Sequence, residues 1–210
     1  MSTVIRKNLL IITAALALLI IVAASHGVGQ SGRPSAESSS SVYRFEDLSE
    51  IDGAVSRLVR TDDAIAMELH THGLEPNAPY TVWWVIFNSP QGCSEPCDLD
   101  DLFNADGTMN VNPDAAISVL WADGAISTED GRASFSGLLP QGRPLGEVVF
   151  GPGLVDAYAA EVHLVVRSHG PADLGRLYLQ LHTFEPHPIL GGDCVPCQDQ
   201  HFSVHLPPRN

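Results

Sequence analysis

The chain has 210 residues, of which 44% are hydrophobic and 17% charged, a balance typical of one folded domain and not of a disordered chain. Its 25 acidic residues outnumber its 11 basic ones, which gives a net charge of −14 with histidine taken as neutral. Such a surface repels phosphate groups, so nucleic acids and anionic membrane surfaces are not expected as partners. An unidentified protein or small-molecule ligand is the remaining class of partner.

The first thirty residues have the pattern of a secretion signal. Arg6 and Lys7 precede an apolar run at residues 9–24, and small residues follow it. The run is shorter than the roughly twenty residues that span a bilayer, so a signal peptide at residues 1–25 is predicted, with an uncleaved N-terminal membrane anchor as the alternative. We therefore expect a secreted or periplasmic protein. The Ser-rich residues 26–41 predict a disordered linker, followed by one domain over residues 42–210.

Short apolar runs separated by Gly, Pro, Asn and Asp make up the predicted domain. Residues 64–71 alternate, with Ile65, Met67 and Leu69 on one face. Residues 80–88 are dense in β-branched and aromatic residues, as in a central strand. Further strands are predicted at residues 116–121, 132–139, 147–150, 161–168, 177–184 and 201–206.

Helical signals are weak along the whole chain. Residues 49–60 predict a short helix and residues 98–103 a single turn, and no segment has an apolar period of 3.6 over three turns. Asp123-Gly124 and Asp130-Gly131 are dipeptides that favour hairpin turns. About eight short strands therefore predict an all-β fold, an antiparallel β-sandwich with disulfide-stapled loops.

The four cysteines form two closely spaced pairs, Cys93 with Cys97 and Cys194 with Cys197. In an oxidising compartment they predict two disulfides, and pairing within each pair is favoured over crossed pairing. A redox-active pair and a four-cysteine zinc site are alternatives. The strand-like segment after Cys197 disfavours the first, and export disfavours the second.

Histidines on the predicted strands are the candidate metal ligands. His70 and His72 share one face of a strand at about 7 Å spacing. His163 and His182 lie on two other predicted strands. If these strands are neighbours in one sheet, their imidazoles could meet at copper or zinc. Alternatively, they are ordinary polar residues on the wetted face of a sheet.

Oxygen donors cluster at residues 98–114, where Asp98, Asp100, Asp101 and Asp106 suit a structural calcium ion. The spacing departs from the helix–loop–helix calcium pattern, so a solvated acidic loop is the alternative. The chain has no Gly-x-Ser-x-Gly, phosphate loop or His-Glu-x-x-His motif. No catalytic residue and no organic cofactor is therefore predicted, and an enzyme is not favoured.

Several segments together resemble a group of exported bacterial proteins of uncharacterised function. The segments are residues 80–88 with Pro90 and Cys93, and residues 118–122, 149–154 and 161–170. This resemblance covers most of residues 60–205 and implies no activity.

A shorter resemblance concerns the turn His72-Gly-Leu-Glu-Pro76. It is similar to a turn of chordin-type domains and of copper–zinc superoxide dismutase, both antiparallel sandwiches. In the dismutase a His-x-His pair follows the turn, whereas residues 82–87 of this chain contain no histidine.

Two functional hypotheses follow from the sequence. The first is an exported, non-catalytic binding or structural module of the cell envelope or extracellular space. The alternative is a periplasmic His-based metal-binding or redox protein that uses His70 and His72 together with His163, His182 or His201.

Overall fold

The computed structural model describes residues 32–94, 96–104, 110–142, 147–184 and 197–209. Contacts divide the chain into two units, Met1–Arg33 and Pro34–Asn210, and every described strand belongs to the second. The predicted signal peptide lies outside the described residues. Within the described part of the chain, no helix is long and apolar enough to cross a membrane.

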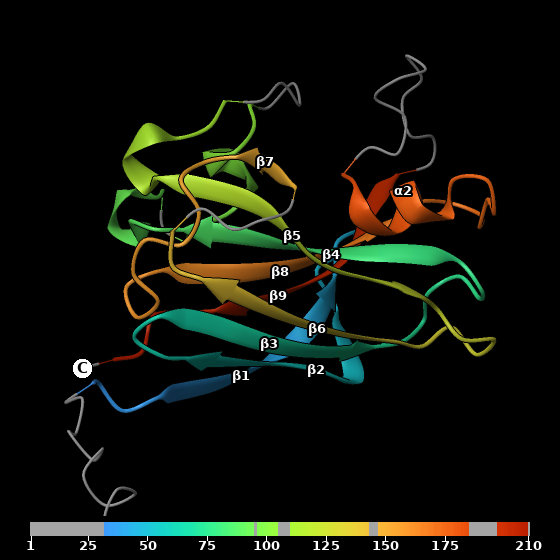
Figure 1. The fold of residues 1–210 in the computed structure, drawn as a ribbon, viewed down its shortest axis with the longest axis horizontal. Helices are drawn as coiled ribbons and strands as arrows, with labels where there is room; N and C mark the ends of the chain where they lie inside the picture. Colours follow the sequence, from blue (N-terminus) through green and yellow to red (C-terminus); the bar gives the residue numbers. More distant parts are fainter. Residues whose placement is uncertain (1–31, 95, 105–109, 143–146, 185–196, 210) are drawn as a thin grey trace, which may run out of the picture. The chain divides into compact units, whose positions relative to one another are not determined.

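Nine antiparallel strands form one hydrogen-bonded sheet in the order β6-β3-β2-β1-β9-β8-β4-β5-β7, which curls into a half-barrel (Figure 1). The strands are β1 (Ala36–Arg44), β2 (Glu50–Arg60), β3 (Ala64–Thr71), β4 (Pro79–Phe87), β5 (Ile117–Ile126), β6 (Ala133–Pro140), β7 (Val148–Phe150), β8 (Glu161–Ser168) and β9 (Gln198–His205). One short helix, α2 (Leu177–His182), and three 3₁₀ turns, η1 (Pro90–Gly92), η2 (Leu99–Asp101) and η3 (Pro113–Ala115), complete the described elements. The all-β antiparallel prediction is confirmed. The two separate sheets of a sandwich are not, because all described strands share one sheet.

Strand β4 is buried on both faces, as its unbroken apolar sequence predicts. Trp84 and Ile86 point into the main core inside the half-barrel. Trp83, Val85 and Phe87 point outward into a second apolar cluster. Residues from the segment between β4 and β5 pack over this second cluster, so an outer layer covers part of the sheet.

Two predicted elements have the opposite structure. Residues 49–60, predicted as a helix, form β2, because pairing with both β1 and β3 outweighs local preference. Residues 177–184, predicted as a strand, contain α2. The buried Gln180 anchors that helix, since its side-chain nitrogen donates to the carbonyls of His169 (3.0 Å) and Pro171 (2.9 Å).

The Ser-rich segment is another correction. The predicted disordered linker reached residue 41, but β1 begins at Ala36, and Ser38–Ser41 pair in register with β2. Strand β1 also pairs with β9 at Tyr43 and Arg44. Backbone pairing with β2 and β9 and the burial of Val42 order this Ser-rich segment, although its composition alone predicts no structure.

Arg60, at the end of β2, is 2% exposed and holds distant parts of the chain together. Its guanidinium donates to the carbonyls of Ala157, Ala160, His205 and Leu206. Burial lowers the pKa of Arg60 to about 10. In the described part of the chain, the partners of this buried cation are four carbonyl groups and no carboxylate.

Candidate functional site

The predicted ligand pair His70 and His72 is placed at the end of β3, where each ring has a partner within the protein. His70 is exposed, and its Nδ1 lies 2.8 Å from the hydroxyl of Ser134 on β6. His72 Nε2 donates to the carbonyl of Asp52 at 2.9 Å. The predicted alternation of β3 is confirmed, with His70 on the face opposite the buried Leu69.

The other two predicted ligands lie on different elements. His163 is on β8, and its Nε2 is 2.7 Å from Glu161 Oε1. His182 is on α2, where its ring stacks between those of Trp121 and Tyr178, with centroids 5.2 and 4.2 Å away. Within the described residues, no group of three ligand atoms spaced for a metal includes a histidine. The structure therefore does not bring the four imidazoles together, and a copper or zinc site remains an unsupported prediction.

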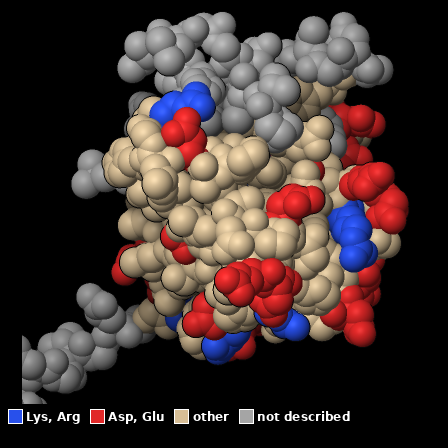
Figure 2. Space-filling model, turned by 90° about the vertical axis from the view of Figure 1, so that its right-hand side faces the viewer, with Lys and Arg blue, Asp and Glu red and all other residues tan. Residues whose placement is uncertain are grey.

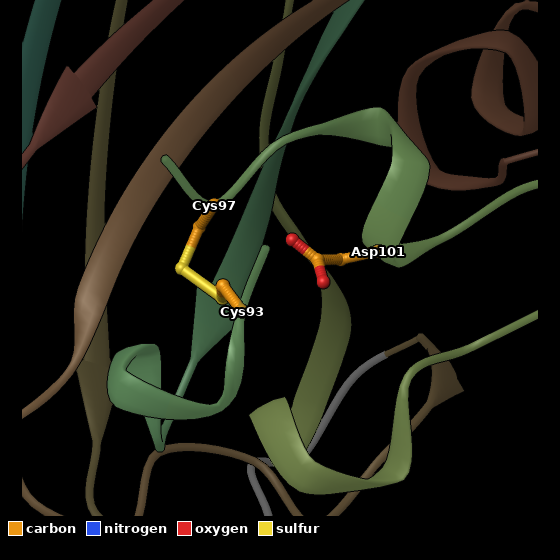
Figure 3. A group of neighbouring side chains, drawn as sticks. All are labelled: Cys93, Cys97 and Asp101. Carbon is orange, nitrogen blue, oxygen red and sulfur yellow. A yellow bond between two sulfur atoms is a disulfide. The ribbon is translucent and has the colours of Figure 1, made fainter. Parts of the chain in front are cut away.

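Cys93 and Cys97 form a disulfide, which confirms local pairing for the first pair. Cys197 is also disulfide-bonded, and Cys194 lies outside the described residues. Cys93, Cys97 and Asp101 are the one ligand cluster with metal-like spacing found among the described residues (Figure 3). Because the disulfide consumes both thiols, this cluster has no thiolate to offer a metal.

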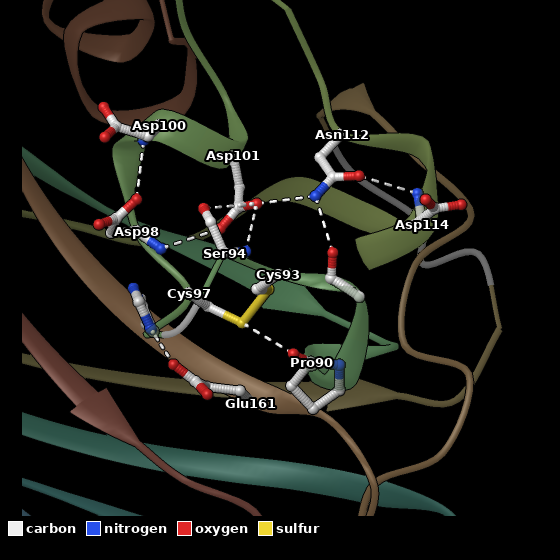
Figure 4. Close-up of a disulfide and its surroundings, with 12 residues drawn as sticks. Pro90, Cys93, Ser94, Cys97, Asp98, Asp100, Asp101, Asn112, Asp114 and Glu161 are labelled. Carbon is white, nitrogen blue, oxygen red and sulfur yellow. Dashed lines mark hydrogen bonds and ion pairs between the residues drawn. A yellow bond between two sulfur atoms is a disulfide. The ribbon is translucent and has the colours of Figure 1, made fainter.

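Two carboxylates of the acidic loop, those of Asp98 and Asp101, accept hydrogen bonds from neighbouring residues (Figure 4). Asp101 is 2% exposed; its Oδ1 accepts from Asn112 Nδ2 at 2.8 Å and from the Ser94 backbone, and its Oδ2 accepts from the Asp98 backbone. Asp98 Oδ1 in turn accepts from the backbone of Asp100 at 2.9 Å. These hydrogen bonds hold the acidic loop in a folded conformation. The predicted calcium ligand Asp106 lies outside the described residues, so the calcium prediction stays untested.

An apolar groove of about 460 Å³ lies on the outer face of β4, β8 and β9. Its floor comes from outward-pointing residues of these strands, and its walls come from the segment after β1 and from the disulfide loop. The lining residues are Phe45, Leu48, Val85, Phe87, Pro96, Cys97, Asp98, Asp100, Leu102, Glu161, His163, Val165, Phe202, Val204 and Leu206.

The groove exists because the outer layer covers only part of the apolar outer face. On β9, Phe202 and Val204 point outward and are half-buried, while His201 and His205 point inward and are buried. The outer face of β3, on the same sheet, carries the exposed Glu68 and His70. This polar part of the sheet is separated from the groove by β2 and β1. An apolar stretch that the described outer layer leaves partly exposed is a feature of binding surfaces.

Glu161 and His163 form the polar part of the groove. Glu161 is 6% exposed, and its carboxylate accepts from His163 Nε2. The His163 ring also packs against Phe87, with centroids 4.8 Å apart. A carboxylate is thus held in an apolar wall, where a charged or hydrogen-bonding ligand group would interact with it more strongly than in water.

Three further histidines are buried, and their rings bond to hydroxyl groups of the interior. Burial is the main cause that lowers the pKa of His169, His201 and His205 to about 4 each. Their partners are Thr81 at 2.7 Å for His169, Thr71 at 3.0 Å for His201, and Ser56 at 2.8 Å with Ser38 at 2.9 Å for His205. Neutral and internally bonded, they act as structural residues at neutral pH.

The sequence analysis identified His163 but not the groove around it. One signal was available in the alternation of side chains along β8 and β9. It places Val165, Phe202 and Val204 on the outer face of the sheet, where polar residues are usual. The walls were not predictable, because they come from segments distant in sequence.

Comparison of the chain with protein-family models, with curated proteins and with solved structures finds no match.

Proposed function

We propose that this protein is an exported, non-catalytic binding module and that the groove on the outer face of β4, β8 and β9 is its ligand site. The observation that carries the proposal is the apolar floor formed by Val165, Phe202 and Val204, which the described part of the outer layer leaves partly exposed. Removing such a surface from water is the main driving force for binding an apolar molecule.

The lining chemistry favours binding over catalysis. The described residues around the groove include no serine, threonine or lysine, and their one cysteine, Cys97, is held in a disulfide. Among the described lining residues, Glu161 and His163 are the only acid–base pair, and no hydroxyl or free thiol lies beside them for the pair to activate. The alternative metal-binding function has no comparable support, since His70, His72, His163 and His182 lie apart.

Export is supported by the N-terminal sequence and by the Cys93–Cys97 disulfide, which persists in oxidising compartments. The disulfide loop also contributes Pro96, Cys97 and Asp98 to the groove. An oxidising location would therefore preserve one wall of the proposed site.

A filled groove tests the proposal. Val165 points outward from β8 and lines the groove, so Val165→Phe places a larger ring in the site without disturbing the main core. Val55→Phe is the matched control, because Val55 is exposed on β2 and does not line the groove. We expect 1-octanol to bind the wild type and the control with one site by calorimetry, and the Val165→Phe protein at least tenfold more weakly. Equal binding by both variants, or none by the wild type, would refute the proposal.

A further inference from the structure

Carboxylates outnumber other titratable groups in the groove. Asp98, Asp100 and Glu161 line it together with His163, which pairs with Glu161 at 2.7 Å, and the described lining residues include no lysine or arginine. Asp98 and Asp100 are exposed at the rim, whereas Glu161 is buried in the wall. In Figure 4, Asp98 and Glu161 lie on either side of Cys97.

Nearby arginines do not neutralise these carboxylates. Arg167, on the same outer face of β8, pairs with Asp199 at 2.8 Å, and its guanidinium lies over the ring of Phe184 at 4.1 Å. Arg60 is inside the half-barrel, bonded to carbonyls. The wider surface is acidic as well: Figure 2 shows acidic side chains at several places on one face. The electrostatic field at the groove therefore favours a cation.

Aromatic rings supply the second half of the recognition chemistry. Phe45 and Phe202 are the half-buried rings of the groove, whereas Phe87 lies fully buried beneath it. The rings of Phe45 and Phe202 meet edge to face with centroids 5.2 Å apart. Ring faces attract organic cations, and ammonium groups in particular, through the negative potential of the π system. Aromatic rings beside carboxylates form the environment that ammonium ligands prefer.

We propose that the groove selects an apolar ammonium compound, with the hydrocarbon part on the Val165 and Val204 floor and the positive charge near Glu161 and the rim aspartates. This inference rests on the proposed function and names its ligand class. A neutral ligand would gain no electrostatic attraction from the carboxylates of Asp98, Asp100 and Glu161, the last of which already pairs with His163 at 2.7 Å, and an anion would be repelled by them.

Three probes of equal chain length test the selection: octylammonium, 1-octanol and octanoate, each titrated into the full-length protein by calorimetry at pH 7 and low salt. We expect octylammonium to bind about tenfold more tightly than 1-octanol, as exposed ion pairs and a cation–π contact together allow. Octanoate should bind more weakly than either. Raising the salt to 300 mM should reduce the preference for octylammonium, because screening acts on the rim charges.

Isosteric variants assign the preference to the groove. Glu161→Gln keeps an acceptor for His163 and removes the negative charge. The double change Asp98→Asn with Asp100→Asn removes the two negative charges at the rim. Each should lower the octylammonium affinity severalfold and leave 1-octanol unchanged, whereas Glu68→Gln, on the exposed face of β3, should change neither.

The outcomes separate this inference from the function it rests on. Equal affinity for the three probes, with binding still lost in Val165→Phe, would overturn the ammonium inference and leave the groove as a ligand site. Tighter binding of octanoate would overturn it in favour of an anionic lipid-like ligand. A dimer in light scattering that Val165→Phe dissociates would show that a second copy occupies the groove, which also overturns it. No binding of any probe would overturn both proposals.

Discussion

Replacing Arg60 with methionine tests whether the buried guanidinium holds the half-barrel together. Methionine keeps an apolar stem of similar reach but leaves the carbonyls of Ala157, Ala160 and His205 buried without a donor, and that of Leu206 partly so. Each buried acceptor left unsatisfied costs at least about 1 kcal/mol. Burying the charge of Arg60, which lowers its pKa, itself costs stability, and methionine avoids that cost. The total loss from the unsatisfied carbonyls is therefore near the lower end of the range expected for them. We therefore expect a loss of about 3 kcal/mol in the free energy of unfolding.

Urea denaturation followed by tryptophan fluorescence measures this loss, and a thermal melt should fall by about 6–12 °C for a domain of this size. Arg57→Met is the matched control, because Arg57 lies on the same strand but pairs with Glu37 at the surface, so its melt should stay close to that of the wild type. If Arg60→Met loses less than about 1 kcal/mol, or no more than the control, the buried carbonyls do not depend on the guanidinium and the reasoning is wrong.

Three further changes probe other parts of the fold. Burial lowers the pKa of His205 to about 4, below the ordinary 6.5. Between these two pH values the unfolded chain binds a proton at His205 that the folded chain does not bind. The free energy of unfolding therefore falls as the pH falls. His205→Gln should reduce that slope by about 1.4 kcal/mol per pH unit in urea titrations from pH 6 to pH 4.5, and an unchanged slope would contradict it. Cys93→Ser with Cys97→Ser removes a very short covalent loop and should cost about 1–2 kcal/mol, while a larger loss would mean that the disulfide supports more than its own loop. Gly124→Ala would place a methyl group against the carbonyl of Leu181, so α2 must shift at a cost of about 1–3 kcal/mol, and an unchanged melt would argue against that close approach.

The sequence predicted the strands whose pattern of apolar and polar residues matches the burial of their two faces. Strand β3 alternates because one face is buried and the other is exposed, and β4 is apolar throughout because both of its faces are covered. The same local logic failed for β2 and for α2, where pairing partners and the buried Gln180 decide the structure. Asp123-Gly124, a dipeptide of hairpin turns, lies inside β5 for the same reason.

The candidate site was less predictable than the fold. The sequence singled out His163 as a metal ligand, but the structure places it against Glu161 and Phe87 in an apolar wall. Its neighbours in the groove come from β4, β9 and two loops, and no local pattern specifies that assembly. Single-sequence parity shows which side chains share a face, but it cannot show which strands are adjacent or which part of a face a loop covers.

The most direct test of the groove as a ligand site is a titration of the ¹⁵N-labelled protein with octylammonium, followed by amide chemical shifts. Binding in the groove predicts saturable shifts concentrated at His163, Val165, Phe202 and Val204, with His70 on the distant face of β3 unaffected. Shifts centred on another face of the sheet, or none at millimolar probe, would contradict the assignment of the groove as the binding site.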